Sequence, residues 1–338
     1  MRRVAIALAI SLPAFAAAAP LQNALRPAGP QAAHIHDLWT LMLIMCTAVF
    51  VAIFVAFLIA LVRAPRATER TLADVGVIRA EERRPTLVVS IALALSALGL
   101  IVLIVASVLT DRALAALPLK DGVVIQVTAH QWWWEIVYDD NEPSRVFRTA
   151  NEIHVPVGRP VVLKLKSDDV IHSFWVPNLH GKKDLVPGHE WTLTFRADEP
   201  GVYRGQCAEF CGHQHAKMAF FVVAQEPAEY EKWAEAQRQP AKEPSNDAQK
   251  RGQEVFLSSP CIMCHTIEGT LAQARMAPDL THLASRSTIA AGTLPNTRGN
   301  LGGWVLDPHS SKPGVAMPPT ALSAADLQAL LAYLESLQ

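Results

Sequence analysis

The stretch Gly205–Met218, GQCAEFCGHQHAKM, decides what the middle of this 338-residue chain folds around. It holds four donor side chains within one short loop, namely Cys207, Cys211, His215 and Met218. Soft sulfur donors combined with imidazole select copper or zinc. Because two thiolates can bridge two metal ions, the loop indicates a dinuclear copper centre, with His172 as the upstream imidazole ligand.

Two other interpretations of this loop stay open. Cys207 and Cys211 also fit a disulfide in an exported domain, and two cysteines with two histidines form a legitimate zinc set. Met218 favours copper, because neither a disulfide nor zinc uses a thioether three residues after a histidine. Of the two histidines in the loop, His215 is the predicted ligand rather than His213, because its spacing to Met218 is typical of a copper loop.

Short β-rich runs surround the loop between residues 123 and 224, separated by Gly, Pro, Asn and Asp. They read VVIQVTA, WWWEIVY, RPVVLKLK, EWTLTFRA and MAFFVVA. This pattern is typical of an antiparallel sandwich or barrel, and we predict such a domain over residues 120–226. His172, in the segment DVIHSFWVP, is expected between two strands. A polar helical pattern that fades into a Pro-containing linker follows over residues 227–245.

Two long apolar runs precede the sandwich. Residues 38–62 carry no ionisable side chain except one cysteine, and residues 86–110 carry no charge. As helices, runs of about 25 residues reach roughly 37 Å, more than the roughly 30 Å of membrane hydrocarbon. We therefore predict a transmembrane hairpin within residues 20–110, which explains why 51% of the chain is hydrophobic and only 18% charged.

The chain opens with a pattern of its own. Residues 1–19 combine two arginines, a short apolar stretch and a small-residue end, as cleavable signal peptides do. The loop between the two spans is rich in arginine, which stays on the cytoplasmic side. We therefore expect a bacterial plasma-membrane protein with two spans, whose later domains lie on the outer, periplasmic side.

The second concentration of chemistry is CIMCH at residues 261–265. Two thiols form thioether bonds to haem and the next imidazole binds iron, which assigns Cys261, Cys264 and His265. Amphipathic helical patterns at 246–257 and 323–337 bracket the motif, so we predict an all-α, class I cytochrome c domain over residues 246–338.

Three methionines are candidates for the sixth iron ligand. Met263 lies inside the attachment loop, and Met276 follows the histidine too closely. Met317 lies on a Pro-stiffened loop ahead of the last helix and is therefore the predicted ligand. A His/Met pair raises the reduction potential, which suits an electron carrier.

Three segments resemble subunit II of haem-copper cytochrome c oxidases, and a two-span hairpin precedes them. They are HQWWWEIVY, DVIHSFWVPNLHGKKDLVPG and GVYRGQCAEFCGHQHAKM. The resemblance implies a cupredoxin fold that carries the dinuclear CuA centre, with side-chain ligands at His172, Cys207, Cys211, His215 and Met218. It also implies that Glu209 binds copper through its backbone carbonyl and that its carboxylate helps hold a magnesium ion at the boundary with subunit I.

The resemblance gives roles to further residues. Trp132 matches a surface tryptophan through which an electron enters, whereas Trp133 and Trp134 are expected to pack on the sheet. Glu82 lies near the position of a glutamate at the mouth of a proton channel, although the Arg83-Arg84-Pro85 sequence that follows departs from the usual pattern. In cytochromes c that this chain resembles, the counterpart of Pro278 accepts a hydrogen bond from the haem-ligating imidazole.

A cytochrome c domain fused to such a subunit is typical of caa-type oxidases. We therefore predict that electrons enter a proton-pumping cytochrome c oxidase here, pass from covalent haem c to CuA, and continue to the haems of subunit I, where O2 becomes water. Expected partners are subunit I, further oxidase subunits, membrane lipid and a cytochrome c or another periplasmic donor. Nucleic acid is not expected, because the net charge is −1.

Other functions fit less well. The main alternative is the CuA-carrying subunit of a nitric oxide reductase-type complex, which the gas reduced by the copurifying large subunit distinguishes. The haem motif disfavours a copper carrier, and the copper ligands exclude a quinol oxidase subunit.

Overall fold

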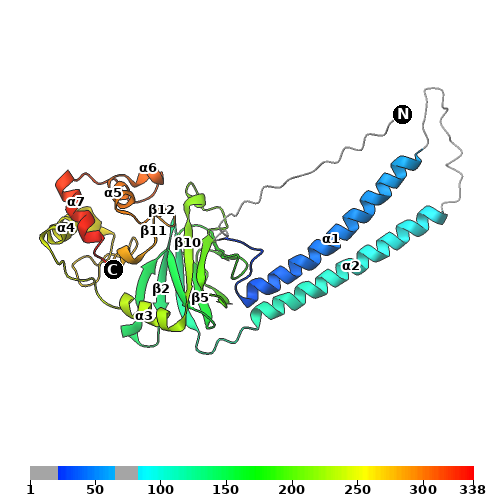
Figure 1. Cartoon of the computed structure of the whole chain (residues 1–338), viewed down its shortest axis with the longest axis horizontal. Helices are drawn as coiled ribbons and strands as arrows, with labels where there is room; N and C mark the ends of the chain where they lie inside the picture. The colour runs from blue at the N-terminus through cyan, green and yellow to red at the C-terminus, as the bar shows by residue number, and fades with distance from the viewer. Residues whose placement is uncertain (1–21, 65–82) are drawn as a thin grey trace, which may run out of the picture.

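The computed structural model describes residues 22–64 and 83–338 and has three parts: a pair of long helices, a β-sandwich and a helical domain (Figure 1). This is the predicted combination of fold classes. The predicted signal peptide and Glu82 lie outside the described residues, as does most of the arginine-rich loop between the spans.

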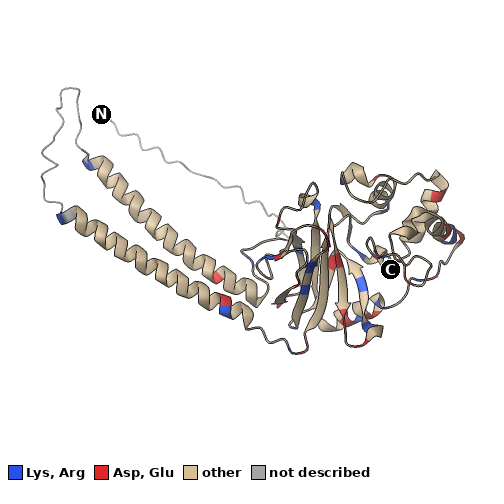
Figure 2. Cartoon of the chain, turned by 180° about the vertical axis from the view of Figure 1, so that it is seen from behind, with Lys and Arg blue, Asp and Glu red and all other residues tan. Residues whose placement is uncertain are grey.

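The long helices α1 (Pro30–Arg63) and α2 (Arg83–Ala115) lie side by side and extend away from the sandwich (Figure 1). Both are longer than the predicted apolar spans, because the helical backbone continues through polar residues at their ends. Figure 2 shows the charged residues of these two helices only near their ends. Gly99 lets the helices approach closely, since a Cβ atom there would lie 3.2 Å from Cε of Met45.

The start of α1 is fixed to the sandwich. Ala28 donates a backbone hydrogen bond to the carbonyl of Asn178 and accepts one from Asp198, at 2.7 and 2.8 Å. Gly29 lies so close to β8 that a Cβ atom would be 2.0 Å from the carbonyl oxygen of Arg196. Any side chain here would push the membrane helix off the sandwich.

The sandwich consists of a five-stranded sheet in the order β3-β2-β1-β5-β8 and a three-stranded sheet in the order β4-β10-β9, with a small β6-β7 ribbon. The strands are β1 (Val123–His130), β2 (Trp133–Asp139), β3 (Phe147–Ala150), β4 (Glu152–Pro156), β5 (Pro160–Ser167), β6 (His172–Phe174), β7 (Lys183–Leu185), β8 (Trp191–Arg196), β9 (Gly201–Gln206) and β10 (Ala219–Gln225).

The expectation of purely antiparallel strands is wrong at two places. β1 pairs with β5 in parallel, and β4 pairs with β10 in parallel. For β1 and β5 the reason is the path of the chain, which leaves the first sheet after β3, forms β4 in the second sheet, and returns as β5 beside β1. Strands connected by a crossover run parallel, whereas directly connected neighbours such as β1 and β2 form an antiparallel hairpin.

Strict alternation of buried and partly exposed residues along β1, β2 and β5 fills the sandwich core. Trp134 of β2 is fully buried and makes edge contacts with the rings of Phe174 and Phe220, at centroid distances of 6.0 and 5.0 Å. Its ring also lies 6.2 Å from that of His172. A rigid aromatic cluster therefore lies directly behind the predicted metal ligand, as expected for Trp134.

The helix α3 (Pro227–Gln237) covers one end of the sandwich and leads to the helical domain. That domain contains α4 (Asp247–Ser258), α5 (Arg298–Leu306), α6 (Pro308–Ser311) and α7 (Ala324–Leu334), with the two-residue strands β11 (Thr288–Ile289) and β12 (Leu294–Pro295). Helices α4 and α7 begin where side chains of Asn246 and Ser323 cap them. They cross at Gly252, where a Cβ atom would lie 2.1 Å from the carbonyl oxygen of Ala329.

Candidate metal centres

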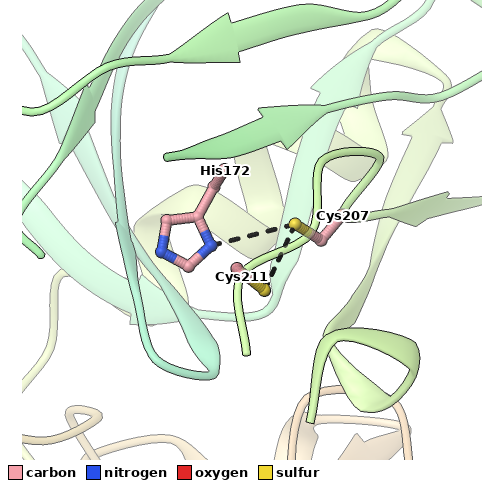
Figure 3. A group of neighbouring side chains, drawn as sticks. All are labelled: His172, Cys207 and Cys211. Atoms are coloured by element: carbon pink, nitrogen blue, oxygen red, sulfur yellow. Dashed lines mark hydrogen bonds between the residues drawn. The ribbon is translucent and has the colours of Figure 1, made fainter. Parts of the chain in front are cut away.

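Three predicted copper ligands lie together at one end of the sandwich (Figure 3). The short strand β6 begins at His172, so this residue lies at a strand start rather than between strands. Sγ of Cys207 lies 3.8 Å from Nδ1 of His172 and 3.7 Å from Sγ of Cys211. All three side chains are buried, and their ligand atoms lie within 4.8 Å of one another. Both cysteines are free thiols, so the structure forms no disulfide here.

The remaining predicted ligands converge on the same two sulfur atoms. Sγ of Cys211 lies 3.6 Å from Nδ1 of His215 and 3.8 Å from Sδ of Met218. The Cys207 thiol donates a hydrogen bond to the backbone carbonyl of Glu209, at 3.3 Å. His213, in contrast, is exposed. Two thiols, two imidazoles, a thioether and a carbonyl therefore surround a single small volume, a donor set suited to copper.

Asp169 fixes the orientation of His172. Its carboxylate lies 2.7 Å from Nε2 of the imidazole, which leaves Nδ1 to face the cysteines. The same carboxylate accepts backbone N–H bonds from Gln131 and Val170, each at 2.6 Å. A carboxylate that holds the outer nitrogen of a histidine ligand is a common arrangement in metal sites. Asp169 is not among the residues predicted from the sequence, although its position three residues before His172 is a usable signal.

The two thiols differ in acidity. A hydrogen bond shared with Cys211 lowers the pKa of Cys207 strongly, and the contact with His172 acts in the same direction against the effect of burial. The same shared bond, together with burial, raises the pKa of Cys211. The close pair therefore loses its first proton more readily than its second, and metal binding has to displace the second proton.

Contacts to the backbone fix the conformation of the predicted copper loop, residues 207–218. The carbonyl of Cys211 accepts hydrogen bonds from Nε1 of Trp132 and Nε2 of Gln131, both at 2.8 Å. Gly212 follows with φ of +107°, and a Cβ atom there would lie 3.0 Å from Nε2 of Gln131. Trp132 is only 8% exposed, so in this structure it is a buried support of the loop as well as a neighbour of the predicted ligands.

The side chain of Glu209 is partly exposed. Its carboxylate forms an ion pair with Nζ of Lys182 at 3.3 Å, and Lys182 also pairs with Asp184 at 3.5 Å. A magnesium ion bound to the carboxylate of Glu209 would therefore have to displace the ion pair with Lys182.

The haem motif lies on the 3-10 turn Pro260–Met263 and the residues that follow it. Nδ1 of His265 lies 2.7 Å from the carbonyl oxygen of Pro278, and this is the predicted hydrogen bond. This leaves Nε2 available for iron. Burial lowers the pKa of His265, so the ring is neutral and suited to bind a metal. The hydrogen bond to Pro278 and the burial of the ring thus leave His265 oriented and neutral, as an iron ligand requires, with Nε2 free.

A buried arginine gives independent support for a haem in this domain. Arg286 is buried, and its Nη2 donates to the carbonyl oxygen of Asp279 at 2.5 Å. Its Nε has no hydrogen-bond partner among the described residues, and the same is true of the buried hydroxyl of Thr288. Buried polar groups are nearly always paired, so these atoms fit a domain that encloses an additional polar group, such as a haem carboxylate.

The three candidate methionines differ in exposure. Met263 is 64% exposed and Met276 is 78% exposed, whereas Met317 is half-buried on the loop between α6 and α7. The position of Met317 is therefore compatible with its predicted role, which needs a side chain turned towards the domain interior.

Two family profiles match the chain. "Cytochrome C oxidase subunit II, periplasmic domain" matches residues 141–225, and "Cytochrome c" matches residues 249–338.

The chain is also similar to individual proteins. A protein of Alkalihalophilus pseudofirmus named cytochrome c oxidase subunit 2 is 36% identical over 325 residues, which cover 94% of this chain and 91% of that protein. The Bacillus subtilis protein of the same name is 35% identical over 230 residues, or 65% and 63% of the two chains. A solved periplasmic domain of subunit II of the Bradyrhizobium japonicum cytochrome oxidase is 28% identical, with a TM-score of 0.33 and coverage of 36% and 97%.

Proposed function

Because the chain belongs to the cytochrome c oxidase subunit II family, we propose that it is the subunit through which electrons enter a proton-pumping oxidase of the caa type. As a subunit II, the chain is part of a haem-copper oxidase complex. Its two matched domains imply copper in the sandwich and haem in the helical domain. The oxygen-reducing site belongs to subunit I and not to this chain.

The observation that carries the proposal is the convergence of six donors from β6 and the loop after β9. We assign His172, Cys207, Cys211, His215 and Met218 as side-chain ligands of a dinuclear CuA centre, with the carbonyl of Glu209 as the sixth donor. A copper pair bound there supplies one-electron exchange. The chain's contribution is a preformed cage, because Asp169 holds His172 in place and two side-chain donors hold the Cys211 carbonyl.

The helical domain holds the second electron carrier in the proposal. Cys261 and Cys264 bind haem covalently, and His265 and Met317 are the axial ligands. Support comes from the Pro278 contact, which leaves Nε2 of His265 free, and from the half-buried position of Met317.

Electrons are proposed to pass from this domain to the copper loop at Trp132, which contacts the carbonyl of Cys211. The proposed membrane arrangement places both metal domains on the periplasmic side of the bacterial plasma membrane. Subunit I, further oxidase subunits and a cytochrome c or similar donor are the proposed partners, and Glu209 is the proposed magnesium contact at the boundary with subunit I.

The test is the order of reduction in the purified complex. After rapid mixing with a limiting amount of donor, we expect the haem c absorption to change first and the copper absorption to follow. Oxygen consumption should accompany turnover. Replacing Cys261 and Cys264 with serine should stop donor-driven turnover while the copper signal remains. Reduction of copper before haem, or a complex that reduces nitric oxide but not oxygen, would contradict the proposal.

A further inference from the structure

The helical domain is attached to the copper loop by two short segments, which together we call the clamp. They are residues 290–293, the turn between β11 and β12, and residues 311–313, at the end of α6. The backbone N–H of Ala219 donates to the carbonyl of Ala291 at 3.0 Å. Nε2 of Gln214 donates to the carbonyl of Pro313 at 2.6 Å. Ala219 directly follows Met218, and Gln214 directly precedes His215, so the clamp contacts the copper loop beside two predicted ligands.

Lys312 connects both segments of the clamp to the sandwich. It is only 2% exposed. Its Nζ donates to the backbone carbonyl of Trp132 at 2.7 Å and to that of Ala290 at 3.1 Å. One amino group thus bonds the turn between β11 and β12 and the residue proposed to receive the electron. Val315, three residues later, packs against the apolar core of the sandwich.

A buried lysine needs a compensating role, because removing an ammonium group from water is costly. Burial lowers the pKa of Lys312 to about 7, even though the charge of Cys211 acts in the opposite direction. One of the two carbonyl partners of Lys312, that of Trp132, belongs to the other domain. In an isolated helical domain this bond would be missing, and of the two only the bond to Ala290 would remain.

A further contact lies elsewhere in the same interface. The carboxylate of Glu152, at the start of β4, accepts hydrogen bonds from the backbone N–H of Ser287 at 2.8 Å and from its hydroxyl at 2.5 Å. Glu152 is itself buried. The helical domain therefore contacts the sandwich at two separate places, the clamp and Glu152, in addition to its covalent connection through residues 238–246.

We infer that Lys312 is a positioning residue, which fixes the cytochrome domain on the copper loop beside Trp132 in one orientation. The effect of this orientation on electron transfer rests on the proposed function, whereas the docking of the two domains does not depend on it. A fixed pose removes the search that a tethered domain would make before each transfer.

The test uses the full-length, metal-loaded chain with Lys312→Met, and Lys242→Met as the matched control in the exposed linker. Methionine has a similar length but removes the donor to the carbonyl of Trp132, whereas the carbonyl of Ala290 keeps its hydrogen bond from the hydroxyl of Thr293. The direct measurement is amide hydrogen exchange of residues 217–221 and 286–293, because the Ala219 amide bonds across the interface. We expect exchange there to rise about tenfold or more, since two hydrogen bonds from a buried amino group are lost. Lys242→Met should match the unchanged protein.

A second measurement separates positioning from stability. In the assembled oxidase, electron transfer from haem c to copper should slow by a similar factor in Lys312→Met, whereas transfer from copper to subunit I should not change. Lys312→Gln, which keeps a donor but is too short to bridge both carbonyls, should shift both measurements in the same direction by less. This variant also keeps the test decisive if the methionine variant does not fold.

The inference is overturned if exchange in these segments and the haem-to-copper rate both match those of the control. The proposed function would fail separately, through the absence of copper from the loaded chain. In that case the amide exchange would still decide whether Lys312 docks the domain.

Discussion

Removal of both donors to the Cys211 carbonyl should destabilise the copper domain by more than the sum of the single changes. Nε1 of Trp132 and Nε2 of Gln131 each donate to this oxygen at 2.8 Å. Trp132→Phe or Gln131→Met alone leaves one donor in place, so each lost bond should lower the free energy of unfolding by about 1 kcal/mol. Trp132→Phe should lower it slightly further through lost apolar contact.

In the double variant the carbonyl loses both donors beside the buried thiol of Cys211. An unsatisfied buried acceptor adds a penalty of about 1–3 kcal/mol, which neither single variant shows. We therefore expect a coupling energy of about 1 kcal/mol or more in the double-mutant cycle.

The assay is denaturant unfolding of the detergent-solubilised, metal-loaded chain, followed by the copper absorption. Trp133→Phe is the matched control, because Trp133 stacks on His130 at 4.5 Å and is a half-buried neighbour in the same aromatic run. It should show no coupling with Gln131→Met. Additive losses within about 0.3 kcal/mol for the Trp132 pair would refute the shared-acceptor argument.

Three further outcomes follow from single contacts. Asp169→Asn should weaken copper binding about 10- to 100-fold in a competition titration, because the carboxylate no longer orients His172; unchanged affinity would contradict this role. Burial raises the pKa of Glu152, but the hydrogen bonds to its carboxylate outweigh burial and lower this pKa overall. The ionised carboxylate therefore stabilises the fold above the ordinary carboxyl pKa range, and this stabilisation is lost as the pH falls through the lowered pKa. Glu152→Gln should flatten the acid side of a plot of melting temperature against pH, and an unaltered plot would argue against this role. Gly252→Ala should destabilise the cytochrome domain by about 3 kcal/mol or more in denaturant unfolding, because the new Cβ atom would lie 2.1 Å from a carbonyl oxygen of α7. Gly299→Ala is the control and should be neutral or stabilising, because a Cβ atom there meets nothing within 4 Å. Equal effects of the two substitutions would exclude the packing explanation.

The parts of the fold that the sequence predicted are those with local signals. The apolar runs became α1 and α2, and five alternating β-rich runs became β1, β2, β5, β8 and β10. The parallel pairings of β5 and β4 were missed, because they depend on a crossover between sheets that leaves no periodic pattern. The close approach at Gly29 was missed for a related reason, since it depends on a carbonyl of β8 more than 160 residues away.

The copper loop was readable because four of its donors lie within twelve residues, from Cys207 to Met218. His172 was reached through spacing and resemblance. Lys312 could not be recognised, because a lysine between serine and proline normally lies in solvent, whereas here it is buried and bonds a carbonyl of the other domain. Sequence patterns therefore predicted the metal donors, whereas the residues that orient and connect them required the structure.

The central claim is that this chain holds a copper pair and a covalent haem. Metal analysis of the intact, metal-loaded chain, together with its near-infrared spectrum, tests it most directly. We predict two copper ions per covalent haem and the absorption of a mixed-valence copper pair. Fewer than two copper ions per haem, or zinc in their place, would contradict the assignment of Cys207 and Cys211 as bridging ligands.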